Sequence, residues 1–399
     1  MSDPGGRSFD ILVLNQISGR GLQRLPASRY RTGKDIAAPD AVLVRSADMH
    51  AMAVPDSVLA IARAGAGTNN IPVAAMSKRG VPVFNAPGAN ANAVKELVLT
   101  GMLLAARNIA PALRFVGALD PAMPDMDKAV EEGKKNFAGF EIAGHTLGIV
   151  GLGRVGCLVA DAAIKLGMHV LGYDPDITVD AAWSLPAQVK KAASVAEVLK
   201  NSDFVTLHVP LVAATRDLVN TDNLKLMRAG AVLLNFSREG VVNDDAVLAA
   251  LAAKQLRAYV CDFPSAALNQ HPGVIALPHL GASTREAEDN CAVMVAEQLR
   301  DYLEHGNVVN AVNFPAVSLA RESAWRVAIA NANVPNMLGQ ISTAMAQAGL
   351  NIHTMVNKSR GDMAYTLVDV DSPVSEAVLA HLRAIEGVLA VRYLPDAAP

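Results

Sequence analysis

Three glycines with the spacing of a nucleotide-binding turn lie near the middle of the chain. The segment Gly151-Leu-Gly-Arg-Val-Gly156 directly follows the apolar run 146–150, and Asp174 ends another apolar run eighteen positions after Gly156. The first glycine permits a tight turn, the second lets the backbone approach a pyrophosphate, and the third allows close helix–strand packing. The N-terminus of the following helix supplies free N–H groups and partial positive charge. The pattern predicts a dinucleotide-binding βαβ unit.

The acidic residue of this unit indicates which dinucleotide is bound. A carboxylate at Asp174 can accept hydrogen bonds from both ribose hydroxyls, and it would repel a 2′-phosphate. The sequence therefore predicts NAD rather than NADP.

An arginine and a histidine follow two further apolar runs. Arg238 comes three positions after the run 231–235, and its guanidinium could hold a substrate carboxylate bidentately and polarise an adjacent carbonyl. His279 follows Pro278, and an imidazole can exchange a hydroxyl proton while hydride moves to or from nicotinamide. Ligands of open α/β sheets bind at the carboxyl ends of strands, so we expect both side chains at the cofactor crevice. His208 and His271 are weaker candidates, because a lone histidine is more often structural.

These residues require a parallel sheet to position them. Short apolar runs alternate with helical stretches from residue 9 onward, which is typical of α/β proteins. A helix is predicted over 91–109, broken by Pro111, and another over 284–304. The predicted strands are 10–14, 41–44, 59–62 and 81–84 before the glycine motif, and 146–150, 168–173, 203–209, 231–235, 256–261 and 274–277 from it onward.

The last quarter of the chain has a different pattern. Residues 308–318 are poor in charge, contain a proline and are interpreted as a linker. Beyond them the order strand 325–330, helix 336–348, strands 350–357 and 363–370, helix 374–386 and strand 388–394 predicts a ferredoxin-like βαββαβ domain. A plain dimerisation module is the alternative use of such a domain.

Composition excludes several classes of protein. The 399 residues suffice for two or three domains, and 51% hydrophobic with 4% aromatic residues is typical of α/β layers. A net charge of −3, from 35 basic and 38 acidic residues without a basic stripe, argues against nucleic-acid binding. Three cysteines lack CxxC spacing, and neither a signal pattern nor an eighteen-residue apolar run is present. We expect a cytoplasmic protein without a metal or a membrane partner.

With these motifs the chain resembles the D-isomer-specific 2-hydroxyacid dehydrogenases over nearly its whole length. Beyond the glycine turn, the resemblance rests on the segments 44–46, 64–71, 84–92, 235–238, 259–264 and 278–279. The asparagine- and alanine-rich loop 88–94 is most similar to the branch that acts on phosphoglycerate. The resemblance implies NAD-dependent oxidation of 3-phospho-D-glycerate to 3-phosphohydroxypyruvate, the first step of L-serine synthesis, by a homodimer or homotetramer.

The resemblance also implies a role for individual residues. His279 would donate and accept the proton, and Arg238 would bind the substrate carboxylate and carbonyl. The substrate phosphate would meet Arg45 and Ser46, with Lys134 or Lys135 as further candidates, and the substrate site would be lined by Gly67, Thr68 and Asn69. The cofactor would be bound by Gly151, Gly153, Arg154, Val155, Gly156, Asp174, Phe236, Ser237, Asp262 and Gly281, with Asp262 near the nicotinamide carboxamide.

The implied fold is a Rossmann-type nucleotide domain, residues 93–282, inserted in a flavodoxin-like substrate domain made of residues 1–92 and 283–315. Residues 324–399 would form a ferredoxin-like ACT domain that self-associates, with Asn333 and Asn351 as candidates for binding an amino-acid effector.

The chain departs from the family pattern at two places. The family usually carries a glutamate paired with the histidine after the Asp-Phe-Pro segment, whereas residues 265–267 here are Ser-Ala-Ala. Either another carboxylate replaces it or the reaction proceeds without one. In the ACT-like domain, Asn331 and Asn336 replace the histidine and the turn glycine of serine-sensing relatives, so we expect serine inhibition to be weak or absent.

Two other functions stay open from the sequence. One is oxidation or reduction of another small 2-hydroxyacid, such as glyoxylate, hydroxypyruvate, lactate or 2-hydroxyglutarate. The other is a non-catalytic regulator that senses NAD and an amino acid. Arg45 discriminates between oxidation of 3-phosphoglycerate and the first alternative, because a phosphorylated substrate needs an additional cationic contact.

Overall fold

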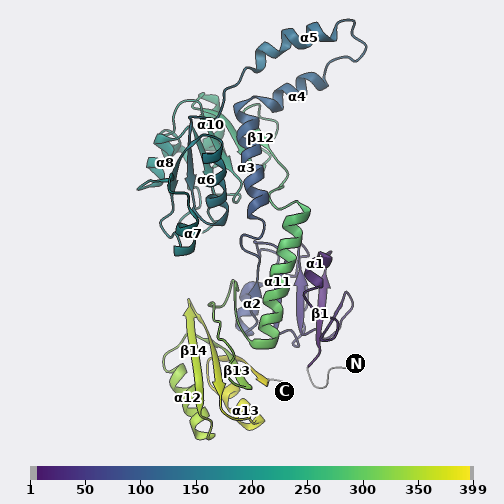
Figure 1. The fold of residues 1–399 in the computed structure, drawn as a ribbon, viewed down its shortest axis with the longest axis vertical. Helices are drawn as coiled ribbons and strands as arrows, with labels where there is room; N and C mark the ends of the chain where they lie inside the picture. Colours follow the sequence, from purple (N-terminus) through teal and green to yellow (C-terminus); the bar gives the residue numbers. More distant parts are fainter. Residues whose placement is uncertain (1–6, 396–399) are drawn as a thin grey trace. The chain divides into compact units, whose positions relative to one another are not determined.

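The computed structural model describes residues 7–395, which belong to two compact units (Figure 1). Among the described residues, unit 1 comprises 7–90 and 285–395, and unit 2 comprises 91–284. The C-terminal module therefore groups with the two segments predicted as the substrate domain.

Unit 2 contains a seven-stranded sheet in the order β12-β11-β10-β9-β6-β7-β8, and all its paired strands are parallel. From β6 the chain first adds β7 and β8 on one side and then returns to add β9 on the other. The carboxyl ends of β6 and β9 thus flank the point at which the strand order reverses, where open α/β sheets bind nucleotides. The strands are β6 (Thr146–Val150), β7 (His169–Tyr173), β8 (Lys190–Lys191), β9 (Phe204–Leu207), β10 (Ala231–Asn235), β11 (Leu256–Cys261) and β12 (Val274–Ala276).

Two hydrophobic clusters fill this unit, one containing Val205, Leu233 and Tyr259 and the other containing Ile149, Val232 and Val260. The successive members of β10 alternate between the clusters, as expected of a strand with helices on both faces. The covering helices are α3 (Ala91–Ala106), α6 (Arg154–Lys165), α7 (Val179–Ser184), α8 (Val195–Asn201), α9 (Thr221–Leu224) and α10 (Asp244–Ala252).

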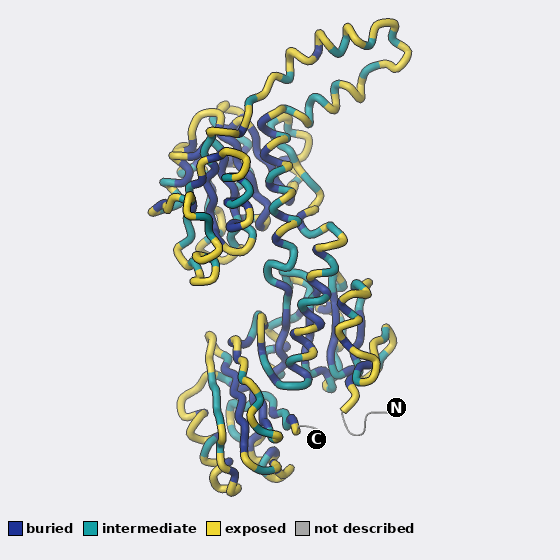
Figure 2. Tube along the Cα trace, in the orientation of Figure 1, coloured by how far each residue is buried: buried dark blue, intermediate teal, exposed yellow. Residues whose placement is uncertain are grey.

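A pair of short helices in unit 2 lies outside these layers. The segment comprises α4 (Ile109–Gly117), α5 (Met126–Gly133) and a 3₁₀ turn, η1 (Lys134–Phe137), and α4 buries none of its residues (Figure 2). The predicted helix break at Pro111 is wrong. The break lies at Asn108, whose φ is +50°, and Pro111 occupies the first turn of α4, where its missing N–H costs no helical hydrogen bond.

No single helix in residues 7–395 is long and apolar enough to cross a membrane. Only α3 and α4 taken together have the length and apolar composition of a membrane span, and a bend of 71° separates them. Val94, Val98 and Met102 of α3 belong to the core of unit 2.

The first sheet of unit 1 is parallel, with the order β2-β1-β3-β4-β5. This is the predicted flavodoxin-like order. Its strands are β1 (Phe9–Leu14), β2 (Tyr30–Gly33), β3 (Ala41–Val44), β4 (Ala60–Arg63) and β5 (Val83–Phe84), and its helices are α1 (Gly19–Leu22), α2 (Val73–Lys78) and the long α11 (Arg285–His305). Edge strand β2 was not predicted, because Tyr30 is its one buried residue.

The interpretation of residues 308–318 as a linker is wrong. Val308, Ala311, Phe314 and Val317 are at most 5% exposed and belong to the core of unit 1. Isolated bridges also pair Phe84 with Ala311 and Val308 with Val317. Apolar residues at three-residue intervals have fixed this segment against the sheet despite its loop-like composition.

The C-terminal module has the predicted βαββαβ order in an antiparallel sheet, β14-β15-β13-β16. Its elements are β13 (Trp325–Ala332), α12 (Met337–Gln347), β14 (Ile352–Arg360), β15 (Met363–Val370), α13 (Glu376–Ala384) and β16 (Val388–Pro395). One face of the sheet packs on α12 and α13, and Ala328, Tyr365 and Leu367 on the other face join the core shared with α11.

Candidate active site

The glycine turn has the predicted geometry and leaves room for a ligand. Gly151 has φ +95°, and a Cβ there would collide with the carbonyl group of His208. A Cβ on Gly156 would collide with the carbonyl oxygen of Gly151, which explains the close packing of α6 on the turn. By contrast, no atom lies within 4 Å of the position of a Cβ on Gly153. Gly153 caps α6 without a side-chain hydrogen bond, and Arg154 and Val155 are its first residues, so the helix presents free N–H groups to this space.

Asp174 follows β7 and is held in place by two backbone groups. Its Oδ2 accepts a hydrogen bond from the N–H of Leu152 at 2.8 Å, and its Oδ1 accepts one from Asp176 at 3.0 Å. The first bond ties the carboxylate directly to the glycine turn. This is the arrangement that binding of a ribose next to a pyrophosphate requires.

His208 lies beside the same turn, at the end of β9. Its Nε2 is 3.0 Å from Thr206 Oγ1, and burial lowers the pKa of His208 to about 4. The ring is therefore neutral near pH 7 and is unsuited to gaining a proton in catalysis. His271 shapes a loop instead, because its Nδ1 accepts the Gly273 N–H at 3.2 Å.

The loop that carries Arg238 is built on the buried side chain of Asn235. Asn235 Oδ1 accepts from the Ser237 N–H at 3.1 Å and from Ser237 Oγ at 2.8 Å, and its Nδ2 donates to Arg238 O at 2.9 Å. Phe236 is buried in the unit 2 core, so only its backbone can face a cofactor. Partial desolvation lowers the pKa of the Arg238 guanidinium, which nevertheless stays charged.

His279 is held in a strained backbone conformation. Its φ is +55°, which is uncommon for a residue with a side chain, and such strain concentrates at functional sites. Its N–H donates to the carbonyl oxygen of Asp262 at 3.1 Å, and its exposed ring packs on Phe263 with centroids 4.8 Å apart.

The Asp262 carboxylate fixes the residues that follow His279. Its two oxygens accept the N–H groups of Leu280 and Gly281 at 2.7 and 2.8 Å. Burial raises the pKa of Asp262, and these two hydrogen bonds oppose that rise. The expected placement of Asp262 at a nicotinamide carboxamide stays a prediction, but the carboxylate already has partners in its own unit.

The carboxylate partner that the family pairs with its histidine has no counterpart in the described part of unit 2. No acidic side chain there hydrogen-bonds the His279 ring, which packs on Phe263, but the Asp262 carboxylate lies close enough to His279 for a charge interaction. Orientation of the ring therefore depends on the backbone of the Asp262-anchored loop. Among residues 7–395, no group of His, Cys, Asp or Glu side chains is placed to hold a metal ion.

The expected substrate-binding residues of unit 1 lie on loops after two adjacent parallel strands. Arg45 and Ser46 follow β3, and the loop 67–69 follows β4. Asn15 Oδ1 accepts the N–H groups of Ser46 at 3.1 Å and Ala47 at 2.5 Å. Asn70 Nδ2 donates to Ala47 O at 2.7 Å and Arg45 O at 3.3 Å, which joins the two loops. Sequence reasoning missed both asparagines.

Arg45 is paired in this structure with a residue far away in the sequence. Its Nη2 lies 2.6 Å from Glu288 Oε1 on α11, and both side chains are more than a third exposed. A substrate phosphate would have to share or displace this partner. Lys134 lies on η1 in unit 2 and pairs with Glu131.

The two asparagines proposed for an effector lie at opposite ends of the C-terminal sheet. Asn333 Nδ2 donates to Gly361 O at 2.9 Å, whereas the Asn351 N–H donates to Asp371 Oδ1 at 3.3 Å. Asn333 lines a small cavity together with Asn331 and Asn357. Asn331 is fully buried, and its Oδ1 has no hydrogen-bond partner among the described residues.

The chain is similar to proteins of known activity. The model of the family "D-isomer specific 2-hydroxyacid dehydrogenase, NAD binding domain" matches residues 101–281. The D-3-phosphoglycerate dehydrogenase of Escherichia coli (strain K12) is 33% identical over 344 residues, which cover 82% of this chain and 79% of the relative. That of Haemophilus influenzae is 32% identical over 343 residues, with the same coverage.

A solved structure, the NAD⁺-bound 3-phosphoglycerate dehydrogenase of Entamoeba histolytica, has a TM-score of 0.60 and 24% identity over 76% of this chain and 98% of that chain, a likeness of fold. Together with the glycine turn, Arg238 and His279, the relatives establish that this chain belongs to the D-isomer-specific 2-hydroxyacid dehydrogenase family.

Proposed function

We propose that this protein is a D-3-phosphoglycerate dehydrogenase, which oxidises 3-phospho-D-glycerate to 3-phosphohydroxypyruvate with NAD as the first step of L-serine biosynthesis. The observation that carries the proposal is the delivery of Arg238 and His279 to the carboxyl ends of β10 and β12, in the sheet that holds the glycine turn. The relatives at 32–33% identity carry the same name.

NAD supplies the acceptor for the two electrons that leave C2 of the substrate. Arg238 holds the substrate carboxylate in a bidentate pair, which orients C2. His279 takes the proton of the C2 hydroxyl as general base, and the developing carbonyl is polarised by the Arg238 guanidinium. In place of a paired carboxylate, the loop anchored by Asp262 positions the His279 ring.

Changing these two residues tests their roles. Arg238→Lys should raise KM and lower kcat, because an ammonium cannot reproduce the planar fork of a guanidinium. His279→Ala should chiefly lower kcat, by a factor of about 100 or more, because proton transfer belongs to the transition state. Near-normal turnover of His279→Ala would contradict its role as general base. Absence of turnover in the unaltered chain would favour the non-catalytic NAD-sensing regulator, which the missing carboxylate partner suggests.

Arg45 decides between a phosphorylated and an unphosphorylated substrate. NADH formation should be measured with 3-phosphoglycerate and with D-glycerate, for the unaltered chain and for Arg45→Ala. The substitution should raise KM for 3-phosphoglycerate about tenfold or more and leave D-glycerate nearly unaffected, since a charge-assisted contact is lost. Arg31→Ala, which removes an exposed ion pair in the same unit, is the matched control. Equal losses on both substrates would favour another 2-hydroxyacid.

We infer further that the C-terminal module is an ACT domain that forms a continuous sheet with a second copy through β14. Ile352 pairs with Val370 at one end of β15, and Arg360 pairs with Met363 at the other, where Asn333 is bound. Antiparallel pairing of two β14 strands would bring Asn351 of a second copy to the cavity of Asn331, Asn333 and Asn357. An effector with an ammonium and a carboxylate suits such amides.

Serine inhibition is expected to be weak or absent. Asn331 replaces a histidine in this cavity, and its side-chain amide donates to Ala332 O at 2.7 Å rather than pointing freely to a ligand. Initial rates under rising L-serine concentration test this; strong inhibition at low serine would contradict it.

We place the enzyme in the cytoplasm, where three free, buried cysteines stay reduced.

A further inference from the structure

Arg45, which we expect to bind the substrate phosphate, already holds a carboxylate in this structure. Its Nη2 lies 2.6 Å from Oε1 of Glu288, in the first turn of α11. The two side chains are 36% and 41% exposed, so a ligand from solvent can reach the pair. A phosphate that approaches Arg45 therefore meets a second negative charge at the same guanidinium.

The backbone of Arg45 is fixed by side chains from the two neighbouring strands of its sheet. Asn15, directly after β1, accepts from the next two N–H groups of the chain at 3.1 and 2.5 Å. The carbonyl oxygen of Arg45 accepts from Arg63 Nε at 3.0 Å and from Asn70 Nδ2 at 3.3 Å. These two residues belong to β4 and the loop after it, and β1 and β4 flank β3 in the sheet. The loop cannot carry Arg45 away from α11 without breaking these hydrogen bonds.

The first turns of α11 are fixed as well. Asp289, the residue after Glu288, accepts from Ser18 Oγ at 2.5 Å. One turn further along the helix, Ala292 packs against α1 so closely that a Cβ on Gly21 would lie 2.6 Å from it. The helix therefore cannot turn Glu288 away while these contacts hold.

The consequence for a ligand depends on its charge. A guanidinium carries several N–H donors, so Arg45 can hold a phosphate while Glu288 remains in contact. The phosphate then lies close to the carboxylate, and like charges at such a distance repel each other. An uncharged hydroxyl in the same place meets no such repulsion. Glu288 therefore opposes the binding of a phosphorylated substrate and tolerates its unphosphorylated analogue.

We propose that Glu288 is a specificity-determining residue, which competes with the substrate phosphate for Arg45. It weakens the binding of 3-phosphoglycerate and of the phosphorylated product, and it leaves the binding of D-glycerate unaffected. The inference deepens the proposed function and rests on it, because Arg45 is its expected phosphate contact.

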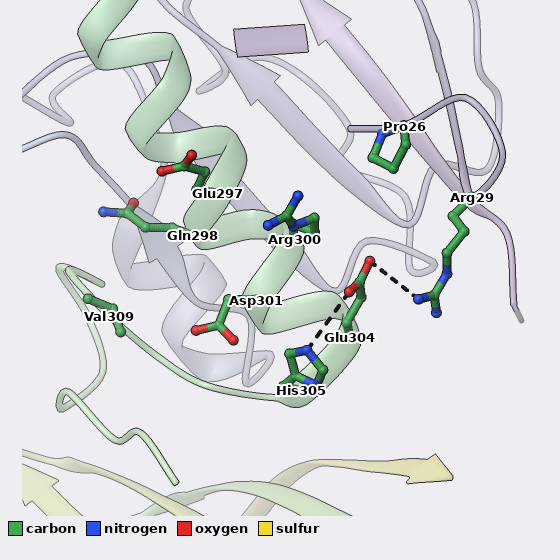
Figure 3. Close-up of a pocket in the computed structure, with 9 residues that line it drawn as sticks. All are labelled: Pro26, Arg29, Glu297, Gln298, Arg300, Asp301, Glu304, His305 and Val309. Carbon is green, nitrogen blue, oxygen red and sulfur yellow. Dashed lines mark ion pairs between the residues drawn. The ribbon is translucent and has the colours of Figure 1, made fainter. Parts of the chain in front are cut away.

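Glu288→Gln tests the proposal, because glutamine keeps an oxygen that accepts from Arg45 and removes only the charge. At saturating NAD, KM for 3-phosphoglycerate should fall about tenfold, and KM for D-glycerate should change less than about twofold. The value of kcat should stay equal or fall, since the phosphorylated product is also held longer. The inhibition constant of inorganic phosphate should fall about tenfold as well. Glu297→Gln, which removes a carboxylate from the second half of α11 (Figure 3), is the matched control and should change none of these values.

A double variant shows whether the effect depends on Arg45. In Arg45→Ala, the further substitution Glu288→Gln should lower KM for 3-phosphoglycerate by about twofold or less, because the two anions no longer share a guanidinium. A full tenfold fall in this background would show general repulsion rather than competition for Arg45, and would overturn the proposal.

Other results also overturn it. If Glu288→Gln raises KM for 3-phosphoglycerate, the carboxylate orients Arg45 for the phosphate; if KM is unchanged, the carboxylate has no part in binding. An equal fall in KM for D-glycerate would exclude a role in phosphate discrimination. Failure of the proposed function gives a different result, in which neither the unaltered chain nor Glu288→Gln oxidises 3-phosphoglycerate, or Arg45→Ala affects both substrates alike. The inference would then fall with it.

Discussion

At the scale of a single residue, we expect Asp174 to carry the choice of cofactor. Two backbone N–H groups hold its carboxylate at the glycine turn, so it cannot rotate away from a 2′-phosphate without losing them. Asp174→Ala should lower the ratio of kcat/KM with NAD to that with NADP about tenfold or more, because like-charge repulsion and the hydroxyl contacts disappear together. Asp176→Ala, at the exposed neighbouring position, is the control. An unchanged ratio in Asp174→Ala would contradict this role.

His208 links the nucleotide-binding turn to the pH dependence of stability. Burial lowers its pKa from 6.5 to about 4, so the unfolded chain binds this proton more readily than the folded one between those values. The free energy of unfolding should therefore fall as the pH falls from 6.5 to 4, with a contribution of about 3 kcal/mol from this residue. Urea unfolding at pH 7 and pH 4.5 should show a smaller difference for His208→Gln, whereas exposed His169→Gln should behave like the unaltered chain. Identical differences in all three would refute the assignment.

Residues with local partners could be predicted from the sequence, and those with distant partners could not. The glycine spacing and Asp174 belong to one βαβ unit, so a short window of sequence contains the contacts that they make with one another. Glu288 meets Arg45 from 243 positions away, and Asn15 reaches Ser46 from 31 positions away. Neither lies in a recognisable motif, because the sheet order of unit 1 creates both contacts.

At the scale of an element, Asp262 fixes the loop that carries His279. Asp262→Ala would free the N–H groups of Leu280 and Gly281 and release the strained φ of His279. We expect kcat to fall about tenfold or more while KM for NAD changes little, because the loop and not the cofactor loses its contacts. Asp56→Ala, at a fully exposed position, is the control. A large rise in KM for NAD with an unchanged kcat would instead support a contact between Asp262 and the nicotinamide carboxamide.

Each element that was predicted wrongly has its own physical cause. Strand β2 pairs at a sheet edge and buries Tyr30 alone, so its sequence lacks the apolar run that marks a central strand. Residues 308–318 have the composition of a loop, and only packing against unit 1 gives them structure. Asn108 follows α3 and ends it by adopting a left-handed conformation, which asparagine tolerates. The break was predicted at Pro111 because proline usually ends helices, but Pro111 lies in the first turn of α4.

The C-terminal module is attached to α11 by side chains that satisfy the last carbonyl groups of that helix. Arg392 donates to Tyr302 O and Leu303 O at 3.0 and 2.9 Å, and Tyr365 donates to Gly306 O at 2.8 Å. Arg326 donates to His305 O at 3.1 Å and forms a fully buried ion pair with Asp369. Cations are favourable at a helix C-terminus, where carbonyl groups lack partners.

Breaking the buried ion pair should lower the free energy of unfolding in a single variant, and a second substitution should restore part of it. Arg326→Met leaves Asp369 charged and unpaired, so the free energy of unfolding should fall by about 3–5 kcal/mol. Adding Asp369→Leu removes the uncompensated charge and should recover part of that loss. Urea unfolding of both single variants and the double variant measures the coupling; losses that simply add would show that the two side chains act independently.

At the scale of the whole molecule, two surfaces suit a second copy of the chain. On α4, Ile109, Leu113 and Val116 are 37%, 67% and 55% exposed, and their spacing places them on one side of the helix. In the C-terminal module, β14 is an edge strand whose outer backbone groups are not paired within the described sheet. Each surface can pair with itself across a two-fold axis, and we propose that both contacts are used, with perpendicular axes that close a tetramer.

Light-scattering mass measurements on surface variants test this assembly. We expect a tetramer for the unaltered chain and a dimer for Leu113→Asp with Val116→Asp, because these substitutions place charge in an apolar contact. Neighbouring residues of a strand direct their N–H groups to opposite sides, so one of Lys358→Pro and Ser359→Pro removes an outward donor and the other breaks the ladder to β15. The proline variant that removes the outward donor should also give a dimer, and its unfolding temperature should be unchanged. Combined with the α4 substitutions it should give a monomer. A mass that both sets leave unchanged would place the subunit contacts elsewhere.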